Sequence, residues 1–443
     1  MMSETRTIAV LPPPVPGAPP RTRAPRPERW TMDNGLQVIA LPRSTVPQVV
    51  LRMAFAAGSA ADPAEFPGTA SLTGGLLTEG TETMTADELN ARLDGLGASV
   101  HASVGHDFAE VEAVFLSETL AEGIALMAEV AIRPTFPERE VERIRAESLD
   151  AILSRLDEPA NVAEDRSALE VFGPAHPYGH PPFGTAEGIR TVPRDALVAF
   201  HAAHYRPRGA FLVASGDFDT AELRALLDEA FAGWTGEPPS IGYGADADAA
   251  VAAGRLVVVP WEDAAQSEIR IAGLGLDRLS PDWFAGSVAN YVLGGSTITG
   301  RLGSNLREDK GWTYGARSYF LPGLALGGWV AETAVDVEVT AAAVQEMLSE
   351  MRRLADERVP DDELRRAKDA MILSLPRYFE TPSGVAGRFV TLEAYSLPHD
   401  YWDTYADRVE AVTAEDVQRV ARQVFHPDRV VRVVVGAMPE AGA

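Results

Sequence analysis

Four of the eight histidines form two close pairs, a pattern from which a metal site could be built. His176 and His180 lie four residues apart in HPYGH, and His201 and His204 lie three apart in a helix-like segment. The proline and glycine inside HPYGH predict a loop rather than a helical turn that presents two imidazoles side by side. We therefore expect structural or surface histidines here, and not a fixed metal site.

Two carboxylates form a second candidate group. Glu140 and Glu147 lie seven residues apart in EREVERIRAESLDAILSRL, residues 138–156, where Val141 and Ile144 begin an apolar stripe. This periodicity predicts an amphipathic helix, and a spacing of seven places both carboxylates on one of its faces. On spacing alone, solvated helix charges are the simpler interpretation.

The glycine-rich stretch LGGSTITGRLGSNLREDKGWTYGARSYF, residues 293–320, carries the third group. Gly295, four residues, Gly300 and Arg301 half-match the phosphate-loop pattern, but its lysine and hydroxyl are absent, so nucleotide binding is not favoured. We expect the glycines to let a peptide backbone approach closely or to let the segment flex. The predicted substrate-binding glycines are Gly294, Gly295, Gly300 and Gly303.

Arg307 and Tyr314 lie seven residues apart in the same stretch. A phenol can donate a hydrogen bond to an oxyanion, and a guanidinium can bind peptide carbonyls and hold charge that develops on a substrate. On spacing alone, a surface arginine and a partly buried tyrosine are the simpler interpretation.

A fourth segment has the pattern of a helix but lacks side chains that could bind a metal or transfer a proton. GTASLTGGLLTEGT, residues 68–81, places Gly74 and Gly75 side by side, at about 1 kcal/mol each relative to alanine in a helix.

An internal repeat positions these groups. Three segments of the first half recur in order in the second half at offsets of 218, 223 and 220 residues. They pair Pro42 with Pro260, Arg52 with Arg270, Pro159 with Pro382, Tyr205 with Phe425 and Gly216 with Gly436. Strand-like and helix-like runs alternate in each half, which predicts an α+β fold with two similar halves, each a mixed sheet covered by helices. The expected divisions are a Pro-rich arm at 1–27, halves at 28–235 and 254–443, and a linker at 236–253.

Composition limits the classes of function. The chain has 443 residues, 46% of them hydrophobic, and no apolar run long enough to cross a bilayer. A net charge of −25 disfavours nucleic acid and anionic membranes as partners and is compatible with neutral or basic peptides. Absence of cysteine excludes disulfides, thiolate zinc sites and a cysteine nucleophile. The compartment stays open: periplasmic if an export signal precedes these residues, otherwise cytoplasmic.

With its flanks FAAGSAADPAEFPG and ETMTADELNARLDGLGASV, the segment 68–81 resembles the zinc helix of the pitrilysin (insulinase) metallopeptidases and mitochondrial processing peptidases. The similarity extends through the repeat, HPYG and HYRPRGAFLVASGD. Active members carry HxxEH, in which two imidazoles one turn apart hold zinc beside a catalytic glutamate. This chain has Ser71 and Gly75 at the histidine positions, Gly74 at the glutamate position, and no HxxEH or HExxH elsewhere.

The resemblance matches Glu147 to the third zinc ligand, Glu140 to its acidic companion, and Arg307 and Tyr314 to the arginine and tyrosine of the family's second half. One carboxylate without imidazoles cannot hold zinc. We therefore expect no zinc in this chain. The resemblance implies the non-zinc subunit of a heterodimeric zinc endopeptidase, inactive alone, whose HxxEH-bearing partner holds zinc while Arg307 and Tyr314 act in trans on the partner's site.

Two alternatives differ in class. A catalytically silent structural or binding subunit, like the core proteins of respiratory complexes that share this fold, has no need of Arg307 and Tyr314. A stand-alone hydrolase with a new site lacks a nucleophile, base or metal cluster to support it. The sequence does not specify the peptide substrate or its cleavage site.

Overall fold

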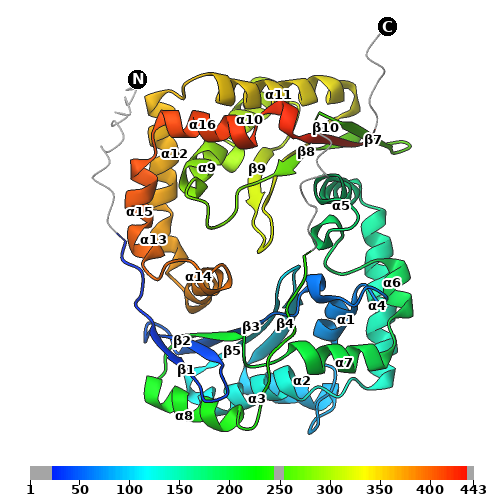
Figure 1. Ribbon diagram of the computed structural model, residues 1–443, viewed down its shortest axis with the longest axis vertical. Coiled ribbons are helices and arrows are strands. Elements are labelled where there is room, and N and C mark those ends of the chain that lie inside the picture. Colours follow the sequence, from blue (N-terminus) through cyan, green and yellow to red (C-terminus); the bar gives the residue numbers. More distant parts are fainter. Residues whose placement is uncertain (1–21, 244–253, 437–443) are drawn as a thin grey trace, which may run out of the picture.

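The chain folds into two mixed sheets, each with helices packed on it, arranged around a central gap (Figure 1). The computed structural model describes residues 22–243 and 254–436. The α+β prediction is confirmed. Most of the predicted arm at 1–27 and of the linker at 236–253 lies outside the described residues, so those boundaries stay predictions.

The first sheet has the strand order β1-β2-β6-β3-β5-β4, in which β2 and β6 run parallel and the other neighbours antiparallel. Its strands are β1 (Glu28–Thr31), β2 (Gln37–Pro42), β3 (Gln48–Phe55), β4 (Ser99–Val104), β5 (Ala109–Leu116) and β6 (Phe211–Gly216). β6 is buried along its whole length, as its apolar run FLVASG predicts for a central strand.

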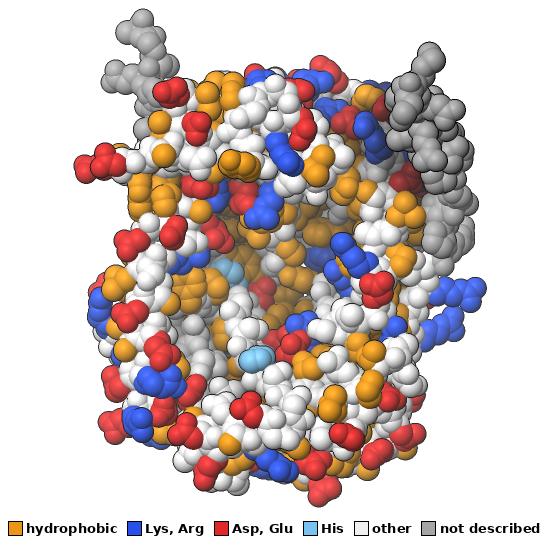
Figure 2. Space-filling view, turned by 180° about the vertical axis from the view of Figure 1, so that it is seen from behind, with side chains coloured by type: hydrophobic (Ala, Val, Ile, Leu, Met, Phe, Trp, Pro, Cys, Tyr) orange, Lys and Arg blue, Asp and Glu red, His pale blue; other side chains and the backbone are white. Residues whose placement is uncertain are grey.

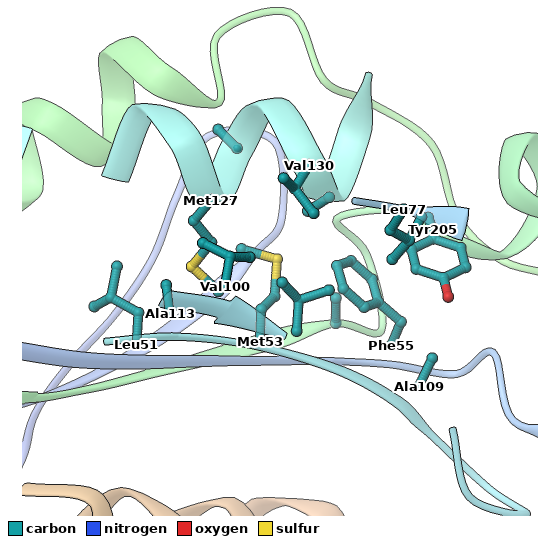
Figure 3. Close-up of a cluster of buried hydrophobic side chains, with 14 of the residues drawn as sticks. Leu51, Met53, Phe55, Leu77, Val100, Ala109, Ala113, Met127, Val130 and Tyr205 are labelled. Atoms are coloured by element: carbon teal, nitrogen blue, oxygen red, sulfur yellow. The ribbon is translucent and has the colours of Figure 1, made fainter. Parts of the chain in front are cut away.

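The helices of the first half lie between and after these strands. They are η1 (Ser59–Ala61), α1 (Thr69–Leu76), α2 (Ala86–Leu96), η2 (Ser117–Thr119), α3 (Leu120–Ile132), α4 (Glu138–Leu156), α5 (Pro159–Phe172), η3 (Pro177–Gly179), α6 (Ala186–Thr191), α7 (Arg194–His204) and α8 (Thr220–Ala230). One face of the sheet packs on α3, where side chains of β3, β4 and β5 meet those of the helix (Figure 3). The residues labelled there are Leu51, Met53, Phe55, Leu77, Val100, Ala109, Ala113, Met127, Val130 and Tyr205.

The second sheet repeats this design in the order β7-β11-β8-β10-β9. Its strands are β7 (Leu256–Pro260), β8 (Gln266–Leu274), β9 (Ala316–Leu321), β10 (Gly328–Asp336) and β11 (Val431–Gly436). Its helices are α9 (Trp283–Asn290), η5 (Tyr291–Gly295), α10 (Arg301–Gly303), η6 (Ser304–Asp309), η7 (Val337–Val339), α11 (Thr340–Asp356), α12 (Asp361–Leu373), α13 (Leu375–Tyr378), α14 (Pro382–Ala394), α15 (Tyr401–Ala411), α16 (Ala414–Val424) and η8 (Pro427–Arg429).

The two halves are similar in three dimensions, as the repeat predicts. At the offset of 220 residues, α7 and β6 coincide in their bounds with α16 and β11. At the offset of 223, α5 and α14 both begin at the paired prolines, Pro159 and Pro382. Proline is favoured in the first turn of a helix because its missing N–H has no partner there in any case.

The repeat does not reveal that the halves exchange helices. α5, from the first half of the sequence, packs on β8 and β11 of the second sheet, and α14 packs on β3 and β6 of the first (Figure 1). Phe172 of α5 joins a core with Val431 and Val433, and Phe389 of α14 joins one with Val50 and Val213. A cut at the predicted linker would therefore leave each sheet without its covering helix, so we expect neither half to be stable alone.

In the described ranges no helix is long and apolar enough to cross a membrane.

Candidate functional site

α1 occupies the residues at which the resemblance places the zinc motif. The preceding Gly68 has a φ of 97°, a left-handed conformation that glycine adopts without strain. The Asp62 carboxylate accepts hydrogen bonds from Gly68 N (2.6 Å) and Ala70 N (2.7 Å), which satisfies N–H groups at the helix start. Burial raises the pKa of Asp62 to about 6. The start of α1 is therefore anchored by a side chain outside the helix.

α1 carries no metal-binding or proton-accepting side chain at the three positions of the zinc motif. Ser71 is half-buried, Gly74 is buried and Gly75 is exposed. A Cβ added to Gly74 would lie 2.5 Å from Val104 Cγ2 on β4, whereas one added to Gly75 would have Ile144 Cγ2 as its nearest neighbour at 3.5 Å. Val104 thus fills the space into which a carboxylate at position 74 would project.

The two glycines give a matched pair of stability predictions. Gly74→Ala should destabilise the protein by about 1 kcal/mol, because overpacking against the stiff Val104 exceeds the gain in helix propensity. Gly75→Ala should stabilise it by about 0.5 kcal/mol, because 3.5 Å is an ordinary contact. Urea unfolding midpoints measure both effects. Equal shifts in the two variants would contradict the role given to Val104, and Val104→Ala should relieve the Gly74→Ala defect.

Arg143 on α4 binds the two glutamates that the sequence singled out. Its guanidinium donates to Glu140 Oε2 (2.7 Å) and Glu147 Oε1 (2.8 Å), and also to the Glu79 carboxylate just after α1. Hydrogen bonds to Glu140 and Glu147 raise the pKa of Arg143, so the cation is permanent. The two glutamates share one face, as predicted, but Glu140 is only 16% exposed and is not a solvated charge.

The residues present do not fit zinc at this place. Ser71, Gly74 and Gly75 offer no imidazole, and Glu140 and Glu147 already face the positive charge of Arg143. A structural or catalytic zinc site takes three or four unprotonated ligands, commonly His, Cys or carboxylate. Within residues 22–243 and 254–436, no three His, Asp or Glu side chains gather in a way that could hold a metal ion.

The histidine pairs have backbone partners, as expected of structural residues. His176 Nδ1 accepts from Tyr178 N (3.1 Å), and His180 Nε2 donates to Pro174 O (2.8 Å). In α7, the rings of His201 and His204 donate to Ala131 O (2.9 Å) and Ala56 O (3.2 Å). These bonds tie α7 to α3 and to the end of β3.

His201 should make the protein sensitive to acid. Burial lowers its pKa from 6.5 to about 4, so the folded protein holds it neutral while the unfolded chain protonates it. Its contribution is complete above pH 6.5 and is lost as pH falls toward 4. Between pH 7 and pH 5 the wild type should lose up to about 2 kcal/mol more than His201→Gln, whose amide keeps a donor for Ala131 O. Parallel urea titrations of the two proteins at both pH values measure this difference. Equal losses of stability in the two proteins would contradict the prediction.

The glycine-rich stretch forms two wide π-type turns, η5 and η6, separated by a loop and α10. Such turns recur at functional sites. Asn305 fixes the stretch to α11, because its amide donates to Glu350 Oε1 (2.8 Å) and Glu346 Oε2 (3.0 Å). Arg301 forms a two-pronged ion pair with Glu363, so the half-matched phosphate loop has its cation already occupied.

The four glycines predicted to bind substrate each have a packing role. Gly294, Gly300 and Gly303 are buried, and a Cβ on any of them would lie within 2.7 Å of this chain's own atoms. Gly295 is exposed, and its nearest neighbour would be the Tyr291 ring at 3.2 Å. These contacts explain why the positions are glycine. Contact with a peptide stays a prediction.

Arg307 and Tyr314 both lie on the segment that leads into β9. Arg307 lies in the last turn of η6, with a side chain 39% exposed and Glu308 Oε1 3.5 Å from its Nε. Tyr314 is 95% exposed. The backbone around it is held in place, because the Thr333 hydroxyl on β10 lies within hydrogen-bond distance of both Gly315 O (3.1 Å) and Thr313 Oγ1 (3.0 Å). A fixed backbone thus presents a phenol to the outside.

Sequence reasoning missed a buried carboxylate that joins the two halves. Asp107, in the β4–β5 turn, accepts from Tyr178 Oη (2.6 Å), Tyr243 Oη (2.8 Å) and Leu324 N (3.1 Å). Burial and the nearby Asp107 raise the pKa of both phenols, so both remain donors. Leu324 is at the tip of the β9–β10 hairpin, so this group of hydrogen bonds to Asp107, the Asp107 node, joins the second half to the first. The tyrosine in HPYG was the only sequence signal.

Comparisons with known proteins show the family and the fold. Two family models match: "Insulinase (Peptidase family M16)" over residues 38–168 and "Peptidase M16 inactive domain" over residues 191–371. Similar curated proteins include uncharacterized zinc proteases of Mycobacterium leprae (25% identical, 90% of this chain and 89% of that protein) and of Bacillus subtilis (23%, 93% and 99%).

Solved structures share the fold over nearly the whole chain. A peptidase M16 inactive domain from Pseudomonas fluorescens is similar with a TM-score of 0.86 and 26% identity, over 93% of this chain and 98% of that one. A protease from Helicobacter pylori has a TM-score of 0.85 at 20% identity, over 93% and 100%. A chain of complex III from Candida albicans has a TM-score of 0.76 at 17% identity, over 92% and 95%. The last two show the fold alone.

Proposed function

The chain belongs to the M16 (insulinase) peptidase family, and from that premise we propose that it is the non-zinc subunit of a heterodimeric zinc endopeptidase. Its partner is a homologous subunit that carries HxxEH. The pair cleaves peptides or unfolded polypeptides, and this chain alone does not. The chain supplies Arg307 and Tyr314 to the partner's site.

One contrast carries the proposal. The place of the zinc motif is blocked, with Val104 against Gly74 and Arg143 holding both glutamates, whereas Tyr314 is almost fully exposed. Burying a phenol within its own chain is the usual outcome for an aromatic residue. A tyrosine held outward by a fixed backbone is instead suited to a second molecule.

Arg307 and Tyr314 have distinct roles in the proposed mechanism. The Tyr314 hydroxyl donates a hydrogen bond to the oxyanion that develops when the scissile carbonyl becomes tetrahedral. The Arg307 guanidinium binds peptide carbonyls and holds the same developing charge. When held by the partner's HxxEH, zinc would supply Lewis-acid polarisation of that carbonyl. Because Thr333 fixes the backbone around Tyr314, little reorganisation is needed when the charge forms.

The sheets offer a place for the peptide. β4 is one edge strand of the first sheet and β9 is one edge strand of the second, and β9 begins two residues after Tyr314. An extended peptide that pairs with such an edge is held through its main chain, so many sequences can bind. Sheet-edge pairing near Tyr314 would place a backbone carbonyl close to the phenol.

A structural or binding subunit is the second candidate. The fold shared with a complex III chain supports it, as does the blocked site on α1. In that case the exposed Tyr314 would be an interface residue without influence on any reaction.

Reconstitution tests the proposal. The purified chain should contain no stoichiometric zinc by elemental analysis and should not cleave unstructured peptides. Adding the HxxEH-bearing homologue, sought first in the neighbouring gene, should produce activity that neither subunit shows alone. Stoichiometric zinc with turnover in the isolated chain would overturn the proposal. A stable complex without gain in activity would favour the structural subunit.

A further inference from the structure

We propose that a depression at the start of α14 is a carboxylate-binding subsite for the bound polypeptide. It has a volume of about 510 Å³ and is lined by Arg377, Tyr378, Ser383, Gly384, Gly387 and Arg388. This inference rests on the proposed function in one respect, namely that the chain binds polypeptides. It adds a charge preference that neither the family nor the Arg307 and Tyr314 pair implies.

The two arginines of the depression differ from the most heavily paired arginines of this chain. The chain has 64 acidic residues against 39 basic ones, and arginines such as Arg143, Arg155 and Arg365 are each held by two or more carboxylates. In the described part of the chain, neither the Arg377 nor the Arg388 guanidinium has a carboxylate oxygen within 4.0 Å, the distance limit for an ion pair. Two cations that line one depression, with no carboxylate beside them among the described residues, can bind an external anion.

Arg388 is held in place without being neutralised. Its guanidinium carbon lies 3.8 Å from the centre of the Tyr378 ring and 5.9 Å from that of Trp402. Stacking on aromatic faces fixes the plane of a guanidinium and leaves its N–H groups free at the edge. The fixed fork is suited to a two-pronged bond with a carboxylate.

One neighbouring arginine, Arg43, adds positive potential, and a second, Arg52, is neutralised by carboxylates. Arg43 Nη1 donates to Phe379 O (2.5 Å), next to Tyr378 in the chain. Arg52 Nη1 would lie 2.8 Å from a Cβ placed on Gly387, so this cation approaches the depression from β3. Arg52 is itself paired with Glu110 and Glu112, whereas the two lining arginines are not. The exposed Glu380 is the acidic residue nearest in sequence to Arg377.

The position of α14 connects the depression with peptide binding. α14 lies between the two sheets (Figure 1), and the hollow between the halves is largely apolar inside, with basic and acidic side chains mixed around it (Figure 2). A carboxylate on the peptide, from an acidic side chain or the C-terminus, would anchor one point of an otherwise sequence-tolerant ligand. This anchor would set the register of the peptide in the chamber.

Calorimetric titration of the full chain tests the subsite directly. Three decapeptides of otherwise uncharged composition are compared: one with blocked ends and a single Glu, the same peptide with Gln, and the Gln peptide with a free C-terminal carboxylate. The Glu peptide or the free-carboxylate peptide should bind about five-fold more tightly than the blocked Gln peptide, and the preference should shrink at high salt. Which of the two is preferred identifies the source of the carboxylate.

Arg377→Gln with Arg388→Gln should abolish the preference and leave the affinity for the blocked Gln peptide unchanged. Arg388→Lys should retain part of it. Arg352→Gln, an exposed arginine on α11, is the matched control and should retain all of it. No preference in the wild type, survival of the preference in the double variant, or no binding of any peptide would overturn the proposal. Because binding is measured without the partner, failure of the reconstituted cleavage leaves this result unaffected.

Discussion

Tyr314→Phe is expected to lower the rate of peptide cleavage by the reconstituted pair about 10²- to 10³-fold, the usual loss on removing one oxyanion donor. Phenylalanine keeps the ring and removes only the hydroxyl. The side chain is 95% exposed and touches little of its own chain, so stability should not change. The rate constant kcat should fall while KM stays within about two-fold, because the lost bond forms only in the transition state.

Arg307→Ala should produce a loss of similar size, accompanied by a higher KM because the guanidinium also binds the substrate. Arg352→Ala is the matched control, since Arg352 is also an exposed arginine on a helix. Full activity of both Tyr314→Phe and Arg307→Ala in an active pair would remove these residues from the mechanism. Wild-type complex formation by both variants would show that any loss is catalytic and does not come from failed assembly.

Asp107→Ala is expected to destabilise the protein by about 3 kcal/mol. The substitution removes the acceptor of Tyr178 Oη, Tyr243 Oη and Leu324 N, and hydrogen bonds to a charged group contribute about 1.5–3 kcal/mol each without being additive. Asp107 is only 9% exposed, so water cannot readily replace it. Urea unfolding measures the loss, and hydrogen exchange at Leu324 N should become faster.

Graded variants distinguish the loss of hydrogen bonds at the Asp107 node from a general packing defect. Tyr178→Phe, which removes one donor, should destabilise the protein by about 1 kcal/mol. Asp107→Asn, which keeps the shape and an acceptor, should fall between Tyr178→Phe and Asp107→Ala. A loss below about 0.5 kcal/mol in Asp107→Ala would show that the halves are held together chiefly by the exchange of α5 and α14.

Much of the fold could be predicted because an internal repeat encodes similar elements in both halves. The paired prolines Pro159 and Pro382 begin equivalent helices, and Gly216 and Gly436 end equivalent central strands. Local periodicity and turn residues suffice for such elements because they depend on neighbours within a few positions. The exchange of α5 and α14 could not be predicted, since an apolar helix face fits either sheet equally well and only the path of the chain in space selects one.

The candidate site likewise has one part that the sequence predicts and another that depends on the tertiary structure. The sequence by itself determined that positions 71, 74 and 75 carry no imidazole or carboxylate, because side-chain type is a property of single residues. Only the tertiary structure decided the rest: Val104 in the space beside Gly74, Glu79 bound by Arg143, and Tyr314 held outward. Those outcomes depend on contacts between residues far apart in the chain, whose distances no local pattern encodes.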